Sequence, residues 1–163
     1  MTMGKLKQEV RNPIDFTVAK LFIESIPPGR WAAYLDVAAA ASGSKLGAVA
    51  IGNRLKNSGS TEFPNCWRVL LNNGSVSPEW QVDSENREDV PSTPFAVVKR
   101  LSNEGVTFDD NFCASETQRW GLEAFSVVVS RLIAERAVRD ATAEPFTRQH
   151  VADPTCNSEG DSR

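Results

Sequence analysis

The chain has 163 residues, 40% of which are hydrophobic, and it carries a formal net charge of −3 at pH 7. This length and composition suit a single domain with a core of ordinary size, and the lack of any long apolar run excludes a membrane-spanning protein. The opening ten residues contain no apolar signal-peptide segment, so we expect a cytoplasmic protein with no membrane partner.

The cysteine and histidine content argues against metal chemistry. Cys66, Cys113 and Cys156 form an odd set without CxxC spacing, and the single histidine is His150, near the C-terminus. A structural zinc site needs more Cys or His ligands at closer spacing, and a disulfide framework needs cysteines that can all form pairs. The sequence therefore predicts neither a metal nor any other cofactor.

Charge is unevenly distributed along the chain. Residues 1–72 hold nine Lys/Arg against five Asp/Glu, a net of +4, whereas residues 73–163 hold nine against sixteen, a net of −7. Phosphate contacts require only a local positive surface, so an acidic protein can still bind nucleic acid through its basic half. The alternative is a solvated surface whose asymmetry has no functional meaning.

In chain order, polar residues 1–12 predict a flexible N-terminal arm. Residues 13–26 carry apolar side chains at helical spacing, which predicts a packed amphipathic helix with Pro13 near its start. Trp31 follows this helix, and we expect its ring to pack in the core rather than to contact a ligand.

Two helices joined by a short glycine-containing turn come next. The first is predicted over residues 34–41 and ends at Ser42-Gly43, and the second begins after the N-cap Ser44 and covers residues 45–56. Such a turn, followed by a helix with a basic and amide-bearing face, can present a helix to nucleic acid. The second helix is expected to face the core through Leu46, Val49, Ala50 and Leu55, which leaves Lys45, Asn53, Arg54 and Lys56 outside.

The chain then makes a sharp turn that carries Cys66. The hydrophobic residues around Asn73-Gly74 predict a β-hairpin that would serve as a wing beside the helix-turn-helix. Residues 81–92 are acidic and polar, which is typical of a flexible loop. Residues 57–61 are likewise expected to be a loop.

Two further helices are predicted in the C-terminal half. One runs from about residue 93 to 104, with Pro94 at its first position and Gly105 after its end. The longest covers residues 115–142, and Ser115-x-x-Gln118 resembles a capping box at its start. This helix can pack on the domain, which is the more usual outcome, or it can pair with another chain. We expect a disordered tail over residues 143–163.

The predicted fold class is therefore mainly α: a winged helix-turn-helix core with a small β-hairpin wing and a long extra C-terminal helix, all within one domain over residues 13–142. Several short motifs within it, between about residues 14 and 108, also carry a family resemblance: Ile26-Pro27-x-Gly29, Tyr34-x-x-Val37-Ala38, Gly52-x-x-Leu55, Cys66-x-Arg68-Val69, Asn73-Gly74 and Leu101-x-x-Glu104-Gly105-Val106-x-Phe108. In order and spacing they resemble the DNA-binding domain of the O6-alkylguanine-DNA alkyltransferases, that is, the methylated-DNA-protein-cysteine methyltransferases, and of the alkyltransferase-like proteins.

That resemblance implies a chemical role for Cys66, because in the alkyltransferases a cysteine thiolate accepts the alkyl group from a guanine rotated out of the duplex. The family activates this thiol with the next residue, a histidine oriented by a glutamate that matches Glu104. Here the histidine position holds Trp67, and an indole nitrogen cannot accept a proton. The position of the base-flipping arginine holds Val49, and Asn65 stands where the family usually has proline.

The resemblance and the helix pattern together predict the DNA contacts. Tyr34 matches the family tyrosine that contacts the phosphate beside the target nucleotide, and Arg68 is a further candidate contact that is also expected to tie the turn to the preceding helix. Trp67 and Trp80 are predicted to line a pocket that stacks on the extruded base. The remaining predicted DNA contacts are Ser44, Lys45, Asn53, Arg54 and Lys56.

Three functions follow as hypotheses. The favoured one is a DNA-binding protein of the alkyltransferase-like kind, which recognises duplex DNA with or without O6-alkylguanine, does not transfer the alkyl group, and hands the site to a repair partner. The enzyme alternative is a methyltransferase with Cys66 as acceptor, although a buried structural thiol is the simpler role for this residue. The third is a winged-helix interaction or regulatory module that uses the long C-terminal helix as its partner surface.

Overall fold

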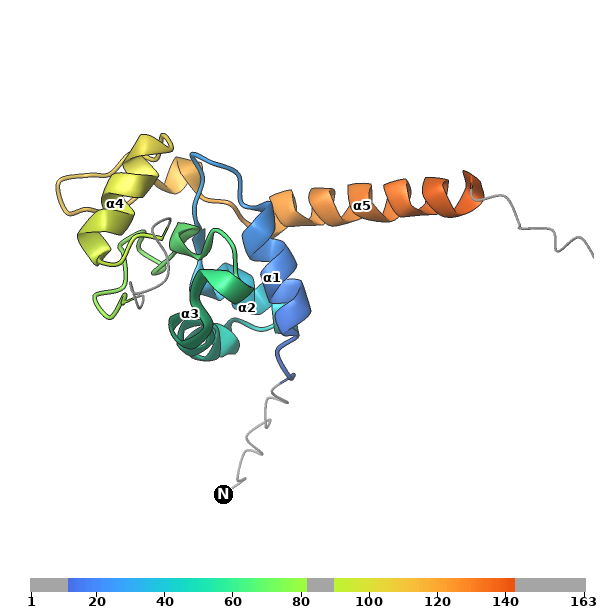
Figure 1. Ribbon diagram of the computed structural model, residues 1–163, viewed down its shortest axis with the longest axis horizontal. Coiled ribbons are helices and arrows are strands. Elements are labelled where there is room, and N and C mark those ends of the chain that lie inside the picture. The colour runs from blue at the N-terminus through green and yellow to red at the C-terminus, as the bar shows by residue number, and fades with distance from the viewer. Residues whose placement is uncertain (1–11, 82–89, 143–163) are drawn as a thin grey trace, which may run out of the picture.

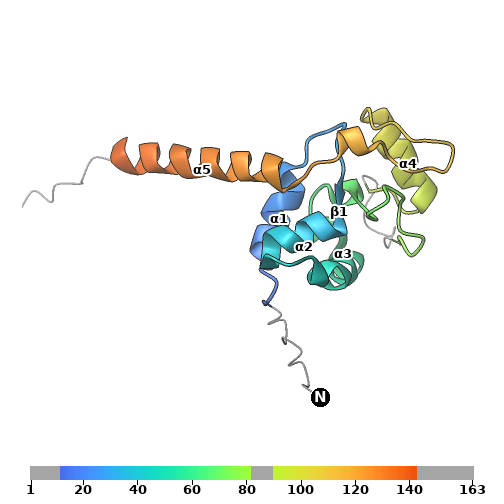
Figure 2. The same cartoon turned by 180° about the vertical axis from the view of Figure 1, so that it is seen from behind.

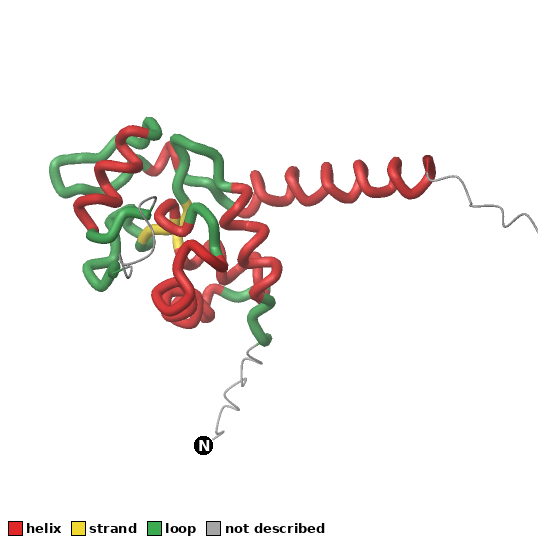
Figure 3. Tube along the Cα trace, in the orientation of Figure 1, coloured by secondary structure: helices red, strands yellow, loops and turns green. Residues whose placement is uncertain are grey.

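The computed structural model describes residues 12–81 and 90–142, so the predicted arm, most of the 81–92 loop, the tail, His150 and Cys156 lie outside the described residues. The described part is mainly helical, with a small parallel sheet of two strands (Figures 1 and 3). None of its helices is both long and apolar enough to cross a membrane. The elements are α1 (Phe16–Ser25), β1 (Ala32–Ala33), α2 (Tyr34–Ser42), α3 (Ala48–Glu62), β2 (Val69–Leu70), α4 (Pro94–Asn103) and α5 (Leu122–Thr142).

Helix α1 begins at its side-chain cap. The carboxylate of Asp15 accepts hydrogen bonds from the backbone N–H groups of Thr17 and Val18 at 2.9 and 3.3 Å, so the helix starts three residues after Pro13. Its inner face buries Phe22 and Ile23 completely. The predicted helix over residues 13–26 is thus confirmed with a later start.

The two helices of the predicted helix-turn-helix are present. Helix α2 ends at Gly43, whose φ of 71° is the left-handed conformation that favours glycine at this position. The Ser44 hydroxyl then accepts a hydrogen bond from the N–H of Leu46, but the turn it caps is a 3₁₀ turn, Lys45–Gly47. The α-helical part, α3, starts only at Ala48 and continues through residues 57–61, which were expected to be a loop.

The inward face of α3 differs from the predicted one. Leu46 and Val49 are 60% and 75% exposed, and Ala50 is exposed as well, whereas Ile51 and Leu55 are buried. The 3₁₀ turn winds more tightly than an α-helix, so it rotates the following residues relative to a helix that runs unbroken from Lys45. Of the four predicted core positions, only Leu55 is correct.

The predicted hairpin wing is wrong in its pairing. Val69–Leu70 forms a parallel pair with Ala32–Ala33, and the described residues after the turn form no partner strand. The Asn73-Gly74 turn itself exists: Leu71 and Ser75 are joined by a backbone hydrogen bond of 2.9 Å. Gly74 accepts a hydrogen bond from the N–H of Ala114, and a Cβ on Gly74 would lie 2.7 Å from the Ala114 oxygen. The turn therefore docks against the C-terminal segment and does not form a wing.

The C-terminal half contains one confirmed and one shortened helix. Helix α4 is capped by Thr93 and followed by Gly105, as predicted. The predicted helix over residues 115–142 begins as α-helix only at Leu122, and the proposed capping box does not form. The Gln118 side chain instead accepts hydrogen bonds from Thr107 and donates one to the Gly105 oxygen, which ties this segment to the end of α4.

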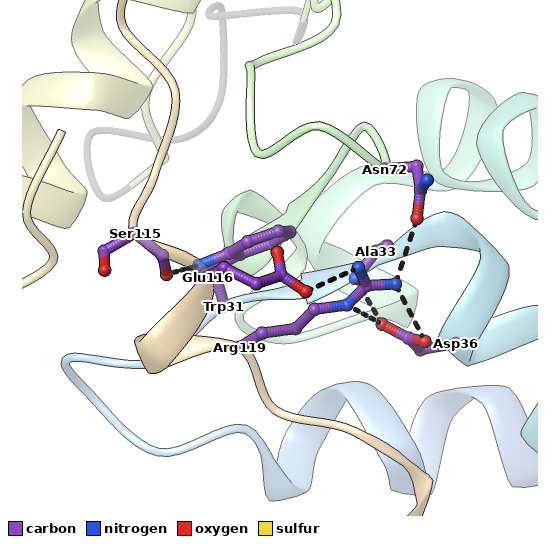
Figure 4. A network of polar contacts seen from close by, with 7 residues as sticks. All are labelled: Trp31, Ala33, Asp36, Asn72, Ser115, Glu116 and Arg119. Carbon is purple, nitrogen blue, oxygen red and sulfur yellow. Dashed lines mark hydrogen bonds and ion pairs between the residues drawn. The ribbon is translucent and has the colours of Figure 1, made fainter. Parts of the chain in front are cut away.

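A polar network joins this C-terminal segment to the start of α2 (Figure 4). Arg119 contacts both carboxylate oxygens of Asp36, at 2.8 and 3.1 Å, and donates further hydrogen bonds to Asn72 and Glu116. Asp36 also accepts a hydrogen bond from the N–H of Ala33, which caps α2. The buried indole of Trp31 donates to the Ser115 oxygen at 2.8 Å, so the prediction that Trp31 packs in the core is confirmed.

Helix α5 packs on the domain only at its beginning. Phe125 is buried, and its ring centroid lies 4.8 Å from that of Phe22 on α1. Residues 130–142 of the described chain are all exposed, and the helix projects away from the other elements in both views (Figures 1 and 2). The expectation that this helix packs on the domain therefore holds for its first turns only.

We expect the charge of Arg119 to contribute strongly to stability. Arg119→Met keeps the aliphatic stem but leaves the largely buried Asp36 carboxylate without its ion pair, which should cost about 2–3 kcal/mol of unfolding free energy. Lys20→Met is the control, because the Lys20–Glu24 pair is exposed on α1 and should contribute less than about 0.5 kcal/mol. Urea unfolding of both variants tests this, and equal losses would contradict it.

Candidate nucleic-acid interface

The outer face of α3 and its preceding turn carries the predicted DNA contacts. Lys45, Asn53, Arg54 and Lys56 are all exposed, as expected. Two of the three cations already have acidic partners: Arg54 contacts Glu62 at 2.7 Å, and Lys56 lies 3.7 Å from Glu79. These ion pairs lie at the surface, where such pairs contribute little, so a phosphate can compete for either cation.

A pocket of ≈260 Å³ opens beside this face, between α3, the start of α2 and residues 71–81. This volume is slightly below the roughly 300–1,000 Å³ of most small-molecule sites and fits one flat ring system. Gly52 lines the pocket on its α3 side, where a Cβ would meet the Tyr34 ring at 3.9 Å, an ordinary van der Waals contact. The lining includes Tyr34, Val49, Asn53, Lys56, Ser77 and Trp80.

Trp80 lines this pocket, as predicted for a base-stacking residue, and a hydrogen bond holds the orientation of its indole. Its indole N–H donates to the Pro91 oxygen at 2.9 Å, and the residue is 8% exposed. The contributions of Gly52 and Ser77 to the lining were not anticipated. Gly52 could have been noticed as a residue without a side chain on the exposed part of a helix, whereas nothing in the sequence points to Ser77.

Tyr34 is the first residue of α2, and it lines the pocket. Burial, together with the nearby Cys66, raises the pKa of the Tyr34 hydroxyl to about 12. The hydroxyl therefore keeps its proton throughout the physiological pH range. A neutral donor is suited to a phosphate oxygen or to an acceptor on a base.

Cys66 is close to Tyr34 but does not line the pocket. It opens the 3₁₀ turn Cys66–Arg68 and is only 1% exposed. Asn65, directly before it, has φ of 65°, a left-handed conformation that asparagine tolerates. Proline has φ fixed near −65°. The proline of the resembled family could not adopt this backbone, so the turn around the thiol differs locally from the one that a proline would make.

Trp67 and Arg68 are buried against Glu104 and do not line the pocket, so the expectation that Trp67 lines it is wrong. The Trp67 indole N–H donates to Glu104 at 3.0 Å, and Trp67 is not among the residues that line the pocket. Arg68 is 7% exposed and donates to Glu104 at 2.8 Å and to the Ile26 oxygen at 2.7 Å. Both side chains therefore hold the turn in place, as expected for Arg68 in its tying role, and neither is placed to contact DNA.

Glu104 is the acceptor at the centre of this cluster. Burial by itself would raise its pKa, but hydrogen bonds from Arg68, Trp67 and Arg100 outweigh burial and lower the pKa below the usual value. A carboxylate in this state is ionised at neutral pH and saturated with donors. It orients the indole of Trp67 as a glutamate would orient an imidazole, but it cannot give the indole a proton-accepting nitrogen.

We expect Glu104 to make stability dependent on acid pH. Its folded-state pKa is lowered, so its contribution is full above the unfolded value of about 4.3 and is lost as pH falls through the folded value. Glu104→Gln should cost roughly 3 kcal/mol at neutral pH, because buried Arg68 loses its counter-charge. Urea unfolding should show this deficit shrinking as the pH falls below the unfolded pKa of about 4.3 and through the lower folded pKa. The exposed Glu24→Gln is the control, and a deficit that does not vary with pH would contradict this role.

No protein-family model, curated protein or solved structure matches the chain. Its function must therefore be inferred from its own residues and from the motifs that they form.

Proposed function

We propose that this protein binds duplex DNA through the helix pair α2 and α3, in the manner of the alkyltransferase-like proteins, and that it recognises alkylated guanine or the duplex itself in repair without transferring the alkyl group. The observation that carries the proposal is the position of the pocket. It opens directly beside the exposed face of α3, the second helix of the helix-turn-helix pair, and Asn53 and Lys56 contribute to both. The motif order in the sequence supports the same function.

In this proposal α3 enters a groove and one base rotates out into the pocket. Lys45, Arg54 and Lys56 approach backbone phosphates, and the ion pairs with Glu62 and Glu79 exchange for phosphate contacts. Trp80 offers a ring for the base to stack on, and the neutral Tyr34 hydroxyl donates to the phosphate beside it. A stacked base of this kind is worth roughly 1–3 kcal/mol.

The second candidate function, alkyl transfer to Cys66, is favoured by one observation: the thiol lies close enough to Tyr34 to influence its pKa, and Tyr34 lines the pocket. Two others oppose it. Cys66 is 1% exposed, so an alkyl group cannot reach its sulfur without a change in the turn. The neighbouring Trp67 donates its only N–H to Glu104 and cannot take a proton from the thiol.

The DNA-binding proposal predicts a loss of affinity for all duplexes when α3 and its preceding turn lose their charges. We expect the triple variant Lys45→Ala, Arg54→Ala, Lys56→Ala to bind more weakly, with a salt dependence shallower by about one unit of slope for each lost phosphate contact. Fluorescence anisotropy of a labelled duplex at several salt concentrations measures both quantities.

The matched control removes three exposed cations from α1 and α5 with the same change in net charge: Lys20→Ala, Arg136→Ala and Arg139→Ala. This variant should bind DNA almost as the wild type does. If both triple variants lose affinity equally, binding depends only on net charge. If neither does, α3 does not contact DNA.

The same proposal predicts that no alkyl group reaches Cys66. After incubation with an excess of duplex containing O6-methylguanine, the intact mass of the protein should be unchanged, since the thiol is buried and the residue after it is Trp67, whose indole cannot accept a proton. A stoichiometric gain of one methyl group that disappears in Cys66→Ser would make the protein an alkyltransferase instead.

A further inference from the structure

Besides the face that contacts the domain through Phe125, helix α5 carries an apolar stripe that the domain does not cover. The stripe has five positions, separated by steps of four, three, four and three residues over two heptads: Val127, Arg131, Ala134, Val138 and Ala141. Four of the five are apolar. Val127 is 68% exposed and Val138 is 63% exposed. Alternating steps of four and three residues place side chains on the seam of a coiled coil.

This stripe is distinct from the face that anchors α5. Phe125, the buried residue of the helix, packs on Phe22. At 100° per residue, Val127 and Ala134 lie roughly opposite Phe125 around the helix axis. The anchoring of α5 to the domain therefore leaves the stripe facing outward along the whole length of the helix.

The projecting part of α5 also lacks the support that helices of its length usually need. Residues 130–142 are all exposed, and in both views no other element runs beside them (Figures 1 and 2). An isolated helix of about 12–15 residues is marginal in water, and helices in proteins gain most of their stability from packing an apolar face. A second helix packed on the stripe would supply that support.

We propose that α5 pairs with the α5 helix of a second copy of this chain, in antiparallel orientation, to form a dimer. The position of Arg131 decides between orientations. In a parallel, in-register pair each Arg131 would face the same arginine of the second copy, which is repulsive. An antiparallel pair avoids this contact.

The antiparallel arrangement also matches both the apolar residues and the charges. In one register of the antiparallel pair, Val127 lies against Val138 of the second copy. The same register places Arg131 beside Glu135 of the second copy. The two-fold axis of the dimer repeats each of these contacts. Arg131 already lies 2.9 Å from Glu135 within its own helix. The two pairs would then join into a four-residue charge cluster across the seam.

The dimer is expected to be weak. The paired segments are short and two of the five seam residues are alanine, so the buried area falls below the roughly 1,200 Å² of stable interfaces. A dissociation constant in about the micromolar to sub-millimolar range follows. Sedimentation equilibrium of the full chain without DNA, over a concentration series, should show a monomer–dimer equilibrium, and a monomer at every concentration up to about 1 mM would overturn the proposal.

Two double variants test the assigned face. Val127→Gln with Val138→Gln should raise the dissociation constant at least tenfold, whereas Leu132→Gln with Ile133→Gln should change it less than threefold. The control is matched, because Ile133 is 64% exposed and the same apolar-to-amide change is made on another face of the same helix. A larger effect of the Leu132 and Ile133 changes would overturn the assignment of the seam.

Charge reversal tests the pairing itself. Arg131→Glu alone and Glu135→Arg alone should each abolish self-association, because each places like charges together across the seam. An equimolar mixture of the two variants should form a heterodimer, since one copy is then acidic and the other basic at this point. Failure of the mixture to associate, while each variant retains its helical circular dichroism, would contradict the pairing of Arg131 with Glu135.

Discussion

The ion pair between Arg119 and Asp36 is the interaction on which most of this structure depends. It joins residues 83 positions apart, and it does so at the N-terminus of α2, where Asp36 also caps the helix through the N–H of Ala33. Tyr34, which lines the pocket, begins this same helix, and Asn72, beside the docked turn, is a further acceptor for Arg119. The pair lies beside the backbone bridge between Trp31 and Arg119, so it holds residues 118–120 against the segment that leads into β1 (Figure 4).

The helices that sequence predicted correctly are those that short-range chemistry defines. Thr93 caps α4, and Gly43 and Gly105 provide the positive φ angles that follow α2 and α4. The errors arise where distant residues decide the outcome. Val69–Leu70 pairs in parallel with a strand 37 residues earlier, and the Asn73-Gly74 turn docks on Ala114, so local turn chemistry alone suggested a hairpin. The 3₁₀ turn that begins at Lys45 changes which residues of α3 face the core, and the spacing of apolar residues in the sequence does not predict such a turn.

The candidate site was anticipated in part for similar reasons. Exposure of the polar face of α3 follows from helical spacing, and Trp80 does line the pocket. Trp67 and Arg68 were misplaced because a sequence does not say toward which neighbour an aromatic or a guanidinium turns; both turn toward Glu104, which lies 36–37 residues away. In this cluster the Trp67 indole donates its N–H to Glu104, which helps to hold the turn in position. The indole offers no proton acceptor to the neighbouring thiol of Cys66.

The central claim is that the pocket beside α3 receives a single base from duplex DNA. The most direct test titrates the wild-type protein with two duplexes of identical sequence, one with guanine and one with O6-methylguanine at a single position, at the same salt concentration. Stacking on Trp80 is open to either base, but loss of normal pairing lowers the cost of extruding the lesion, so tighter binding of the lesion duplex by about fivefold or more is expected. Equal affinities for the two duplexes, or no binding to either, would contradict it.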